Sequence, residues 1–251
     1  MKYKLIFFLF DHFVDMVTRY LGQLTVLSGP FKGMNYIRGS VGSSFMPKIF
    51  GTYELEIAPW ISELPQFGLG LDIGAAEGYY AVGLLRSKIC KRMIAWEMNP
   101  NGQVMMSQLA VANSVDSRLD IRGYCDSTQL NQSISEASGN VLVVIDCEGF
   151  EGDLLEPVDG NLLSRCSFII ETHNSIKPGV HEQLIKKLGA THDIKENFPK
   201  RRNADDIPAI ISGFIKVFQM PILRRLAMSE RRCQGLGWLL CQPKISSVLN
   251  S

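Results

Sequence analysis

From residue 68 onward, short apolar runs alternate with stretches that have the spacing of amphipathic helices. Parallel strands need long crossover connections, usually helices, so this alternation is typical of a parallel sheet covered by helices on both faces. We expect strands at 68–75, 92–99, 118–125, 140–149, 167–174 and 237–244. Helices are expected at 78–88, 100–114, 150–158 and 179–189, with a short one within 127–140. The pattern predicts a doubly wound, mostly parallel α/β fold.

The length of 251 residues suits one α/β domain with additions better than two full domains. We expect residues 1–67 to form an N-terminal extension of helix and loop that packs on a core domain of residues 68–251. Residues 53–64 have helical spacing. Further helical patterns at 205–218 and 222–232 have no assigned place in the fold.

The N-terminus has a six-residue apolar run that ends before Asp11. A helix needs about 20 apolar residues to cross a bilayer, so this run does not predict a membrane span. Residues 1–21 fit an amphipathic helix, for which we favour packing on the core over contact with a membrane surface. We expect a cytoplasmic protein.

Overall charge and cysteine spacing exclude several classes of protein. The formal net charge is only +1, which gives no electrostatic reason to expect a nucleic-acid partner. Six cysteines are present, but none forms a C-x-x-C pair, so the sequence predicts neither a zinc site nor a disulfide framework.

A glycine-containing turn follows the first expected strand, with the pattern Asp72-x-Gly74-x-x-x-Gly78. A dinucleotide-binding turn would have G-x-G-x-x-G, but Ala76 occupies the place of the middle glycine, so an NAD-linked oxidoreductase is disfavoured. The pattern resembles the first motif of class I S-adenosylmethionine-dependent methyltransferases. That resemblance implies a Rossmann-like, seven-stranded sheet and S-adenosyl-L-methionine as cofactor.

Acidic residues also end the second and third expected strands. Glu97 can accept hydrogen bonds from both hydroxyls of a ribose, which is the task of this acid in the methyltransferase family. Asp126 lies where the family often contacts the adenine amino group, although a helix N-cap is an equal alternative. Tyr79 could face the sulfonium, with simple packing as the alternative. The predicted cofactor-binding residues are Asp72, Gly74, Ala75, Glu77, Gly78, Tyr79, Glu97, Met98, Asp126 and Asp146.

The segment "VVIDCEGFEGDLL" carries Asp146, Glu148, Gly149 and Glu151. It resembles the I-D-x-E-G-x-E signature of FkbM-type methyltransferases, which commonly O-methylate sugars and other hydroxylated small molecules. The glutamate that ends the family's next strand is matched by Glu171, and the resemblance covers about residues 70–175. Two departures, Cys147 and Phe150, bear on the shape of the acceptor pocket.

Four groups lie at the ends of the fourth and fifth expected strands, and we predict them as catalytic residues: Asp146, Glu148, Glu171 and His173. Removal of a proton from a hydroxyl acceptor needs a base, and a histidine with its ordinary pKa of about 6.5 suits this better than an exposed carboxylate. The alternative is a magnesium ion held by these acids with Asn174, an arrangement similar to that of catechol-type O-methyltransferases. Our expectation is that no metal is bound.

These features together predict an S-adenosylmethionine-dependent methyltransferase that acts on a hydroxyl of a small molecule or saccharide. A non-catalytic S-adenosylmethionine-binding protein is the alternative from another class. We expect the acceptor pocket to be built from the segment before residue 68, the loop after the fourth strand and residues 175–235. The pattern does not predict an oligomeric state.

Overall fold

The computed structural model describes residues 24–200, 202, 206 and 236–244. The N-terminal amphipathic helix therefore lies outside the described residues, as do the helical patterns at 205–218 and 222–232 apart from residue 206. Within the described part, no helix has the length and apolar character that a membrane crossing requires.

Seven strands form one sheet in the order β3-β2-β1-β4-β5-β7-β6. Their bounds are β1 (Phe67–Ile73), β2 (Cys90–Trp96), β3 (Leu119–Arg122), β4 (Val141–Ile145), β5 (Cys166–His173), β6 (His192–Asn197) and β7 (Leu236–Pro243). Strands β1 to β5 are parallel, whereas β7 runs antiparallel to both neighbours, β5 and β6. The predicted mostly parallel, seven-stranded sheet is confirmed. Because the chain leaves β1 toward β2 on one side and later returns to β4 on the other, the strand order reverses at β1 and β4.

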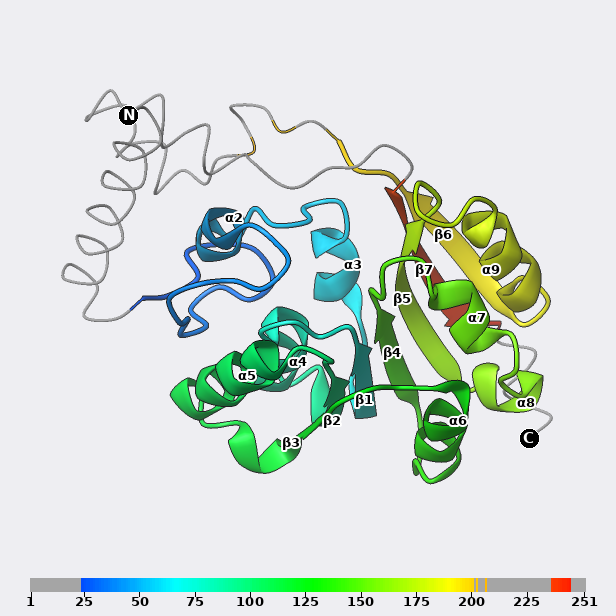
Figure 1. Ribbon diagram of the computed structural model, residues 1–251, viewed down its shortest axis with the longest axis horizontal. Coiled ribbons are helices and arrows are strands. Elements are labelled where there is room, and N and C mark those ends of the chain that lie inside the picture. The colour runs from blue at the N-terminus through cyan, green and yellow to red at the C-terminus, as the bar shows by residue number, and fades with distance from the viewer. Residues whose placement is uncertain (1–23, 201, 203–205, 207–235, 245–251) are drawn as a thin grey trace.

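Helices cover both faces of the sheet, as a doubly wound fold requires (Figure 1). On one face lie α4 (Tyr79–Arg86) and α5 (Pro100–Ala112), and on the other lie α6 (Ser127–Ser135), α7 (Glu151–Leu155), α8 (Gly160–Leu163) and α9 (Val180–Leu188). Each face has its own buried hydrophobic cluster. Helix α5 begins at Pro100, the residue expected to open it, and the Asn99 side chain accepts a hydrogen bond from the Asn101 amide.

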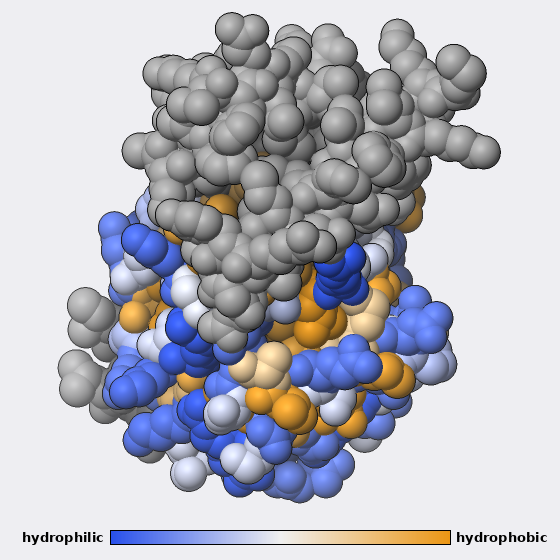
Figure 2. Space-filling view, turned by 90° about the vertical axis from the view of Figure 1, so that its left-hand side faces the viewer, coloured by the Kyte–Doolittle hydropathy of each residue, from blue (hydrophilic) through white to orange (hydrophobic). Residues whose placement is uncertain are grey.

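The segment before the sheet packs on the face that carries α4 and α5. It contains α2 (Phe45–Phe50) and α3 (Ala58–Glu63), and its buried side chains share one hydrophobic cluster with those of α4. Phe31 lies directly against Gly83 of α4, where an added Cβ would meet the ring at 2.7 Å. Figure 2 shows this side of the molecule, where hydrophobic residues of the described part lie in small groups between hydrophilic ones.

Several elements differ from those expected, including the short helices α2 and α8, which the sequence pattern does not predict. The helical spacing of 53–64 yields a helix only from Ala58, because Glu54 has a left-handed backbone with φ 46° and Pro59 suits a first helical turn. Strand β6 is not predicted by the sequence pattern, since most of its residues are exposed or half-buried at the edge of the sheet. A strand with little buried apolar surface carries a weak periodic signal.

Candidate active site

A cavity of about 660 Å³ opens at the carboxyl ends of β1, β2, β4 and β5, and residues 41–56 form one of its walls. Its volume lies within the range of about 300–1,000 Å³ that is usual for small-molecule sites. Open α/β sheets bind ligands at this edge, where the strand order reverses. Ten of the predicted site residues line this cavity: Asp72, Gly74, Ala75, Tyr79, Glu97, Met98, Asp146, Glu148, Glu171 and His173.

Both motif glycines have positive φ, but the reason lies in the protein's own packing. Gly74 has φ 84°, and an added Cβ would lie 1.8 Å from the carbonyl oxygen of Asp146, so the turn after β1 presses against the chain that leaves β4. Gly78 has φ 87°, and a Cβ there would meet Met106 of α5 at 2.5 Å. Gly78 does not line the cavity. Gly74 therefore brings the ends of two central strands together, and Gly78 allows α4 to approach α5.

Glu97 holds the turn in place. Its carboxylate accepts a hydrogen bond from the Ala76 amide at 2.7 Å and one from the Asn99 amide at 2.6 Å. A carboxylate has about four lone-pair positions, so two remain for a ligand. The next residue, Met98, is 72% exposed and lines the same cavity.

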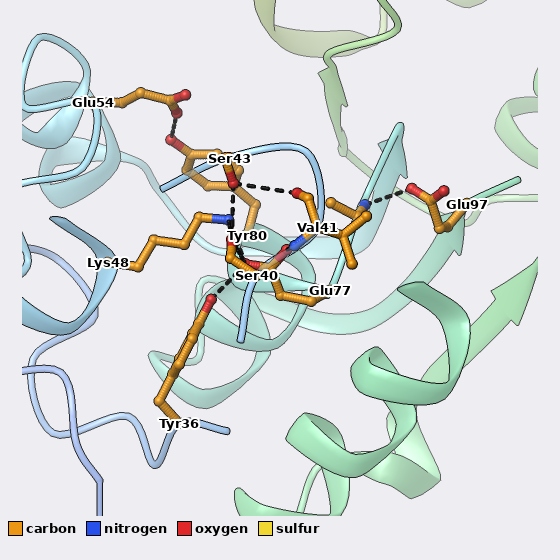
Figure 3. Close-up of polar contacts among 10 residues, drawn as sticks. Tyr36, Ser40, Val41, Ser43, Lys48, Glu54, Glu77, Tyr80 and Glu97 are labelled. Atoms are coloured by element: carbon orange, nitrogen blue, oxygen red, sulfur yellow. Dashed lines mark hydrogen bonds and ion pairs between the residues drawn. The ribbon is translucent and has the colours of Figure 1, made fainter. Parts of the chain in front are cut away.

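The structure does not bring Glu77 into the cavity. Its buried carboxylate forms an ion pair with Lys48 and accepts hydrogen bonds from the Tyr36 hydroxyl at 2.6 Å, the Ser40 hydroxyl at 2.8 Å and the Val41 amide at 2.9 Å (Figure 3). Burial would raise the pKa of Glu77, but these partners hold it below its ordinary value. Glu77 thus links the N-terminal segment, residues 24–66, to the glycine-containing turn. The sequence pattern does not predict this role.

Asp126 also lies outside the cavity lining, and the structure gives it the alternative role considered for it. It is the N-cap of α6, where its side chain accepts a hydrogen bond from the Gln129 amide at 2.8 Å. The Asp126 amide in turn donates a hydrogen bond to the Gln129 side-chain oxygen, which completes a capping box. The neighbouring Tyr124 and Cys125 line the cavity at this position.

Asp72 is buried at the end of β1, and its Oδ2 has no hydrogen-bond partner among the described residues. Burial, together with the charge of Asp146, raises its pKa from 3.8 to about 7. A buried carboxylate oxygen without a partner is costly. Asp72 is also one of the residues that line the cavity.

On the other side of the cavity, His173 is surrounded by carboxylates. Its Nδ1 lies 2.7 Å from Oε1 of Glu151, and its Nε2 lies 3.6 Å from Asp146, 3.6 Å from Glu148 and 3.9 Å from Glu171. All four predicted catalytic residues are thus brought together. Glu151 belongs to the sequence signature, but only the structure shows that it holds the imidazole.

The charges of this cluster act on one another. Burial and the charges of Glu148 and Glu151 raise the pKa of Asp146 to about 6, against the lowering effect of His173 and Glu171. Burial and the charge of Asp146 raise the pKa of Glu171 well above its ordinary value. Burial would lower the pKa of His173, but its hydrogen bond with Glu151 and the nearby carboxylates raise it. The cluster therefore favours bound protons or cations.

The N-terminal segment adds a further buried acid, Glu54, which the sequence analysis does not single out. The Tyr80 hydroxyl donates a hydrogen bond to Glu54 (Figure 3). Burial and the charge of Asp146 raise the pKa of Glu54 to about 8. Glu54, Ala76 and Glu148 all have positive φ and all line the cavity. Such strained backbone in non-glycine residues is typical of functional sites. The sequence analysis indicates Glu54 only indirectly, through the expectation that the segment before residue 68 forms part of the acceptor pocket.

Asn174, which the alternative magnesium site would include, does not line the cavity. Its Oδ1 accepts a hydrogen bond from the His181 amide at 3.1 Å, which directs it to the start of α9.

The five cysteines in the described part of the chain are free, as the absence of a disulfide pattern predicts.

No protein-family model matches the chain, and no curated protein matches its sequence. The resemblance to FkbM-type methyltransferases therefore stays a prediction.

Among solved structures, the chain is similar to the m1A22 tRNA methyltransferase TrmK of B. subtilis, with a TM-score of 0.48 and 9% identity over 76% of this chain and 66% of that chain. It is also similar to TrmK of M. capricolum in complex with S-adenosyl-homocysteine, with a TM-score of 0.47 and 13% identity over 73% and 65% of the two chains. An rRNA methylase from Streptococcus thermophilus gives 0.46 and 10%, over 72% and 90%. The chain thus spans just under two thirds of the length of both TrmK chains. All three TM-scores are below 0.5.

Proposed function

We propose that the chain is an S-adenosylmethionine-dependent methyltransferase that acts on a hydroxyl of a small molecule or saccharide. One observation carries this proposal: the cavity at the reversal of strand order is lined by the buried Asp72, whose Oδ2 has no partner among the described residues, and by Glu97 at the end of the next strand. S-adenosylmethionine has a sulfonium and an ammonium group, so its cationic part matches an acid-lined cavity, and its ribose offers two hydroxyls to Glu97.

The charge of the cavity argues against a dinucleotide. Lys48 is the buried lysine of the lining, and its charge is engaged by Glu77. The Ala76 amide, which a phosphate would need in this turn, already donates to the Glu97 carboxylate at 2.7 Å. A pyrophosphate would therefore meet a carboxylate where it needs a donor. This supports the choice of a sulfonium cofactor over NAD.

Each part of the cavity has a role in this proposal. Glu97 would hold the ribose with its two remaining lone-pair positions, and Asp72 would accept a donor from the cationic end. Gly74 allows the turn to approach the chain after β4 closely. The proposed cofactor-binding residues of the turn therefore lie next to the carboxylates around His173. When bound, S-adenosylmethionine supplies a methyl group activated by its sulfonium. The cluster around His173 would then receive the proton that the acceptor hydroxyl loses.

The acceptor side is bounded by Glu54 and by two apolar side chains, Phe150 and Ile176, which are 38% and 57% exposed and line the cavity. Buried acids beside an apolar rim suit a ligand that has both hydroxyls and an apolar face, as a sugar ring does. The resemblance of residues 143–155 to the FkbM signature supports the same acceptor class.

Calorimetric titration tests the cofactor assignment. We expect S-adenosylmethionine and S-adenosylhomocysteine to bind the purified chain, NADH not to bind, and Asp72→Asn to weaken S-adenosylmethionine more than S-adenosylhomocysteine, since only the former has the sulfonium charge. Binding of NADH alone would contradict the proposal. Release of S-adenosylhomocysteine across a panel of hydroxylated acceptors then separates an enzyme from the alternative, a protein that binds the cofactor without methyl transfer.

A further inference from the structure

We propose that Asp146, Glu171 and His173 bind a divalent transition-metal ion on the acceptor side of the cavity. This inference deepens the proposed function, since the ion would hold the acceptor hydroxyl. It replaces the expectation from sequence that no metal is bound.

The three side chains already have the spacing of metal ligands. One oxygen or nitrogen atom from each lies within 4.8 Å of the others. The Nε2 of His173 is 3.6 Å from Oδ1 of Asp146 and 3.9 Å from Oε2 of Glu171. Two atoms that each lie about 2.1 Å from a shared ion are separated by at most about 4.2 Å, so both separations from Nε2 are compatible with one ion between the side chains.

The imidazole of His173 has the orientation of a metal ligand. This observation is independent of the positions of the two acidic ligands, Asp146 and Glu171. His173 is 4% exposed, and its Nδ1 is bonded to the buried Glu151 at 2.7 Å. Glu151 is itself fixed by the Gly149 amide at 2.9 Å. With the proton on Nδ1, the lone pair of Nε2 points at the carboxylates, none of which is within hydrogen-bond distance of it. Metal-binding histidines characteristically donate their other N–H to a carboxylate in this way.

The mixture of donors indicates the kind of ion. Two carboxylates and one imidazole suit Mn²⁺, Fe²⁺ or Zn²⁺ better than Mg²⁺ or Ca²⁺, which favour shells made only of oxygen. Glu148 is 76% exposed at its side chain and lies 3.6 Å from Nε2, so it can complete the shell or leave a position open. An open position facing a cavity is characteristic of catalytic rather than structural metal sites.

In this site the acceptor oxygen would bind the ion, which lowers the pKa of the hydroxyl. The O–H bond breaks and its proton passes to Glu148 or to water. The oxygen's electron pair forms the new O–C bond, the C–S bond of the cofactor breaks, and its electron pair stays on sulfur. Neutral S-adenosylhomocysteine leaves, so charge and atoms balance without an oxidant or a reductant.

Metal binding can be measured without turnover. The purified chain is treated with EDTA, dialysed and titrated with MnCl₂, ZnCl₂ and MgCl₂ by calorimetry, and Mn²⁺ binding is followed by its electron paramagnetic resonance signal. We expect one Mn²⁺ or Zn²⁺ per chain and weaker Mg²⁺ binding. Glu171→Gln and His173→Gln should each weaken Mn²⁺ at least tenfold. Glu151→Gln, which disturbs only the orientation of His173, should weaken it by about 10- to 100-fold.

His181 provides the matched control. It is a buried histidine whose Nε2 contacts a carboxylate, Glu196, at 2.8 Å, but it lies outside the cavity. His181→Gln should leave Mn²⁺ affinity unchanged. Equal Mn²⁺ affinity in the wild type and in Glu171→Gln, or no binding to folded wild type, would overturn the inference, with circular dichroism to verify folding.

S-adenosylhomocysteine titration separates this inference from the proposed function. Cofactor binding without metal binding overturns the metal site and leaves the methyltransferase proposal standing. Metal binding that needs Glu171 and His173, without any cofactor binding, supports the metal site and overturns the methyltransferase proposal.

Discussion

Lys48 and Glu77 form an ion pair whose side chains are 3% and 0% exposed, and through it the N-terminal segment is joined to the glycine-containing turn. The Lys48 ammonium also lies 4.8 Å from the centre of the Tyr53 ring and 5.5 Å from that of Tyr79. The wall of the cavity formed by residues 41–43 therefore depends on a charge pair that water does not reach.

Breaking this pair should be costly. Loss of one partner leaves the other charge buried alone, so we expect Glu77→Gln to lower the free energy of unfolding by about 3–5 kcal/mol in urea titrations. The double variant Lys48→Met with Glu77→Leu should recover part of that loss, because neither charge is then buried. A loss below about 1 kcal/mol in Glu77→Gln would mean that water reaches the pair.

Glu97→Ala should raise the dissociation constant of S-adenosylhomocysteine at least tenfold in calorimetry. The substitution removes both the proposed ribose acceptor and the hydrogen bond that fixes the Ala76 amide, and bonds to a charged group contribute about 1.5–3 kcal/mol each. Asp126→Ala is the control: it removes the cap of α6 at a cost of about 1 kcal/mol in stability, and it should leave the affinity unchanged. Unchanged affinity in Glu97→Ala would exclude Glu97 from the site.

Gly74 and Gly139 offer a matched comparison of two glycines with positive φ. Gly139 has φ 93° and open space around its Cβ position, so Gly139→Ala should cost only the backbone strain of about 1–2 kcal/mol. Gly74→Ala should cost clearly more, since its Cβ would also meet the Asp146 carbonyl at 1.8 Å. Equal losses in the free energy of unfolding for the two variants, measured in urea, would show that the turn and the chain after β4 can move apart without cost.

Asp72 should make the metal-free protein less stable as the pH rises. Its pKa is raised from 3.8 to about 7 on folding, so the folded chain holds an extra proton between these values and the penalty grows as the pH passes through them. Asp72→Asn removes this penalty. The urea midpoint of the variant should exceed that of the wild type by more at pH 8 than at pH 5, and a constant difference would contradict the buried charge.

Glu56 should have the opposite pH dependence. Burial would raise its pKa, but its two hydrogen bonds with Arg202, both 2.8 Å, and the Lys200 amide lower the pKa from 4.5 to about 2. The stability that it contributes is complete above pH 4.5 and is lost as the pH falls toward 2. Wild type should therefore lose more stability than Glu56→Gln between pH 6 and pH 3, measured by urea unfolding. Parallel losses would show that the pair does not hold the chain after β6.

Local pattern was enough to predict the sheet and most of the acids at its edge. Strands β1 to β5 and β7 lie within the expected apolar runs or overlap them closely, because a buried strand between two helices needs a short continuous apolar segment. Asp72, Glu97, Asp146 and Glu171 meet at one cavity because parallel strands that end in acids present them at the same edge.

The partners of each side chain were decided by the tertiary structure. Glu77 and Asp126 are predicted cofactor-binding residues alongside Glu97, yet one is covered by the N-terminal segment and the other caps α6. Nothing in the spacing of the chain indicates that Lys48 reaches Glu77 across 29 residues or that Glu54 meets Tyr80 across 26. The periodic spacing of apolar residues indicates which face of a helix or strand is buried. The contacts above depend instead on how separate elements pack against one another. This packing decides which acids remain available to a ligand.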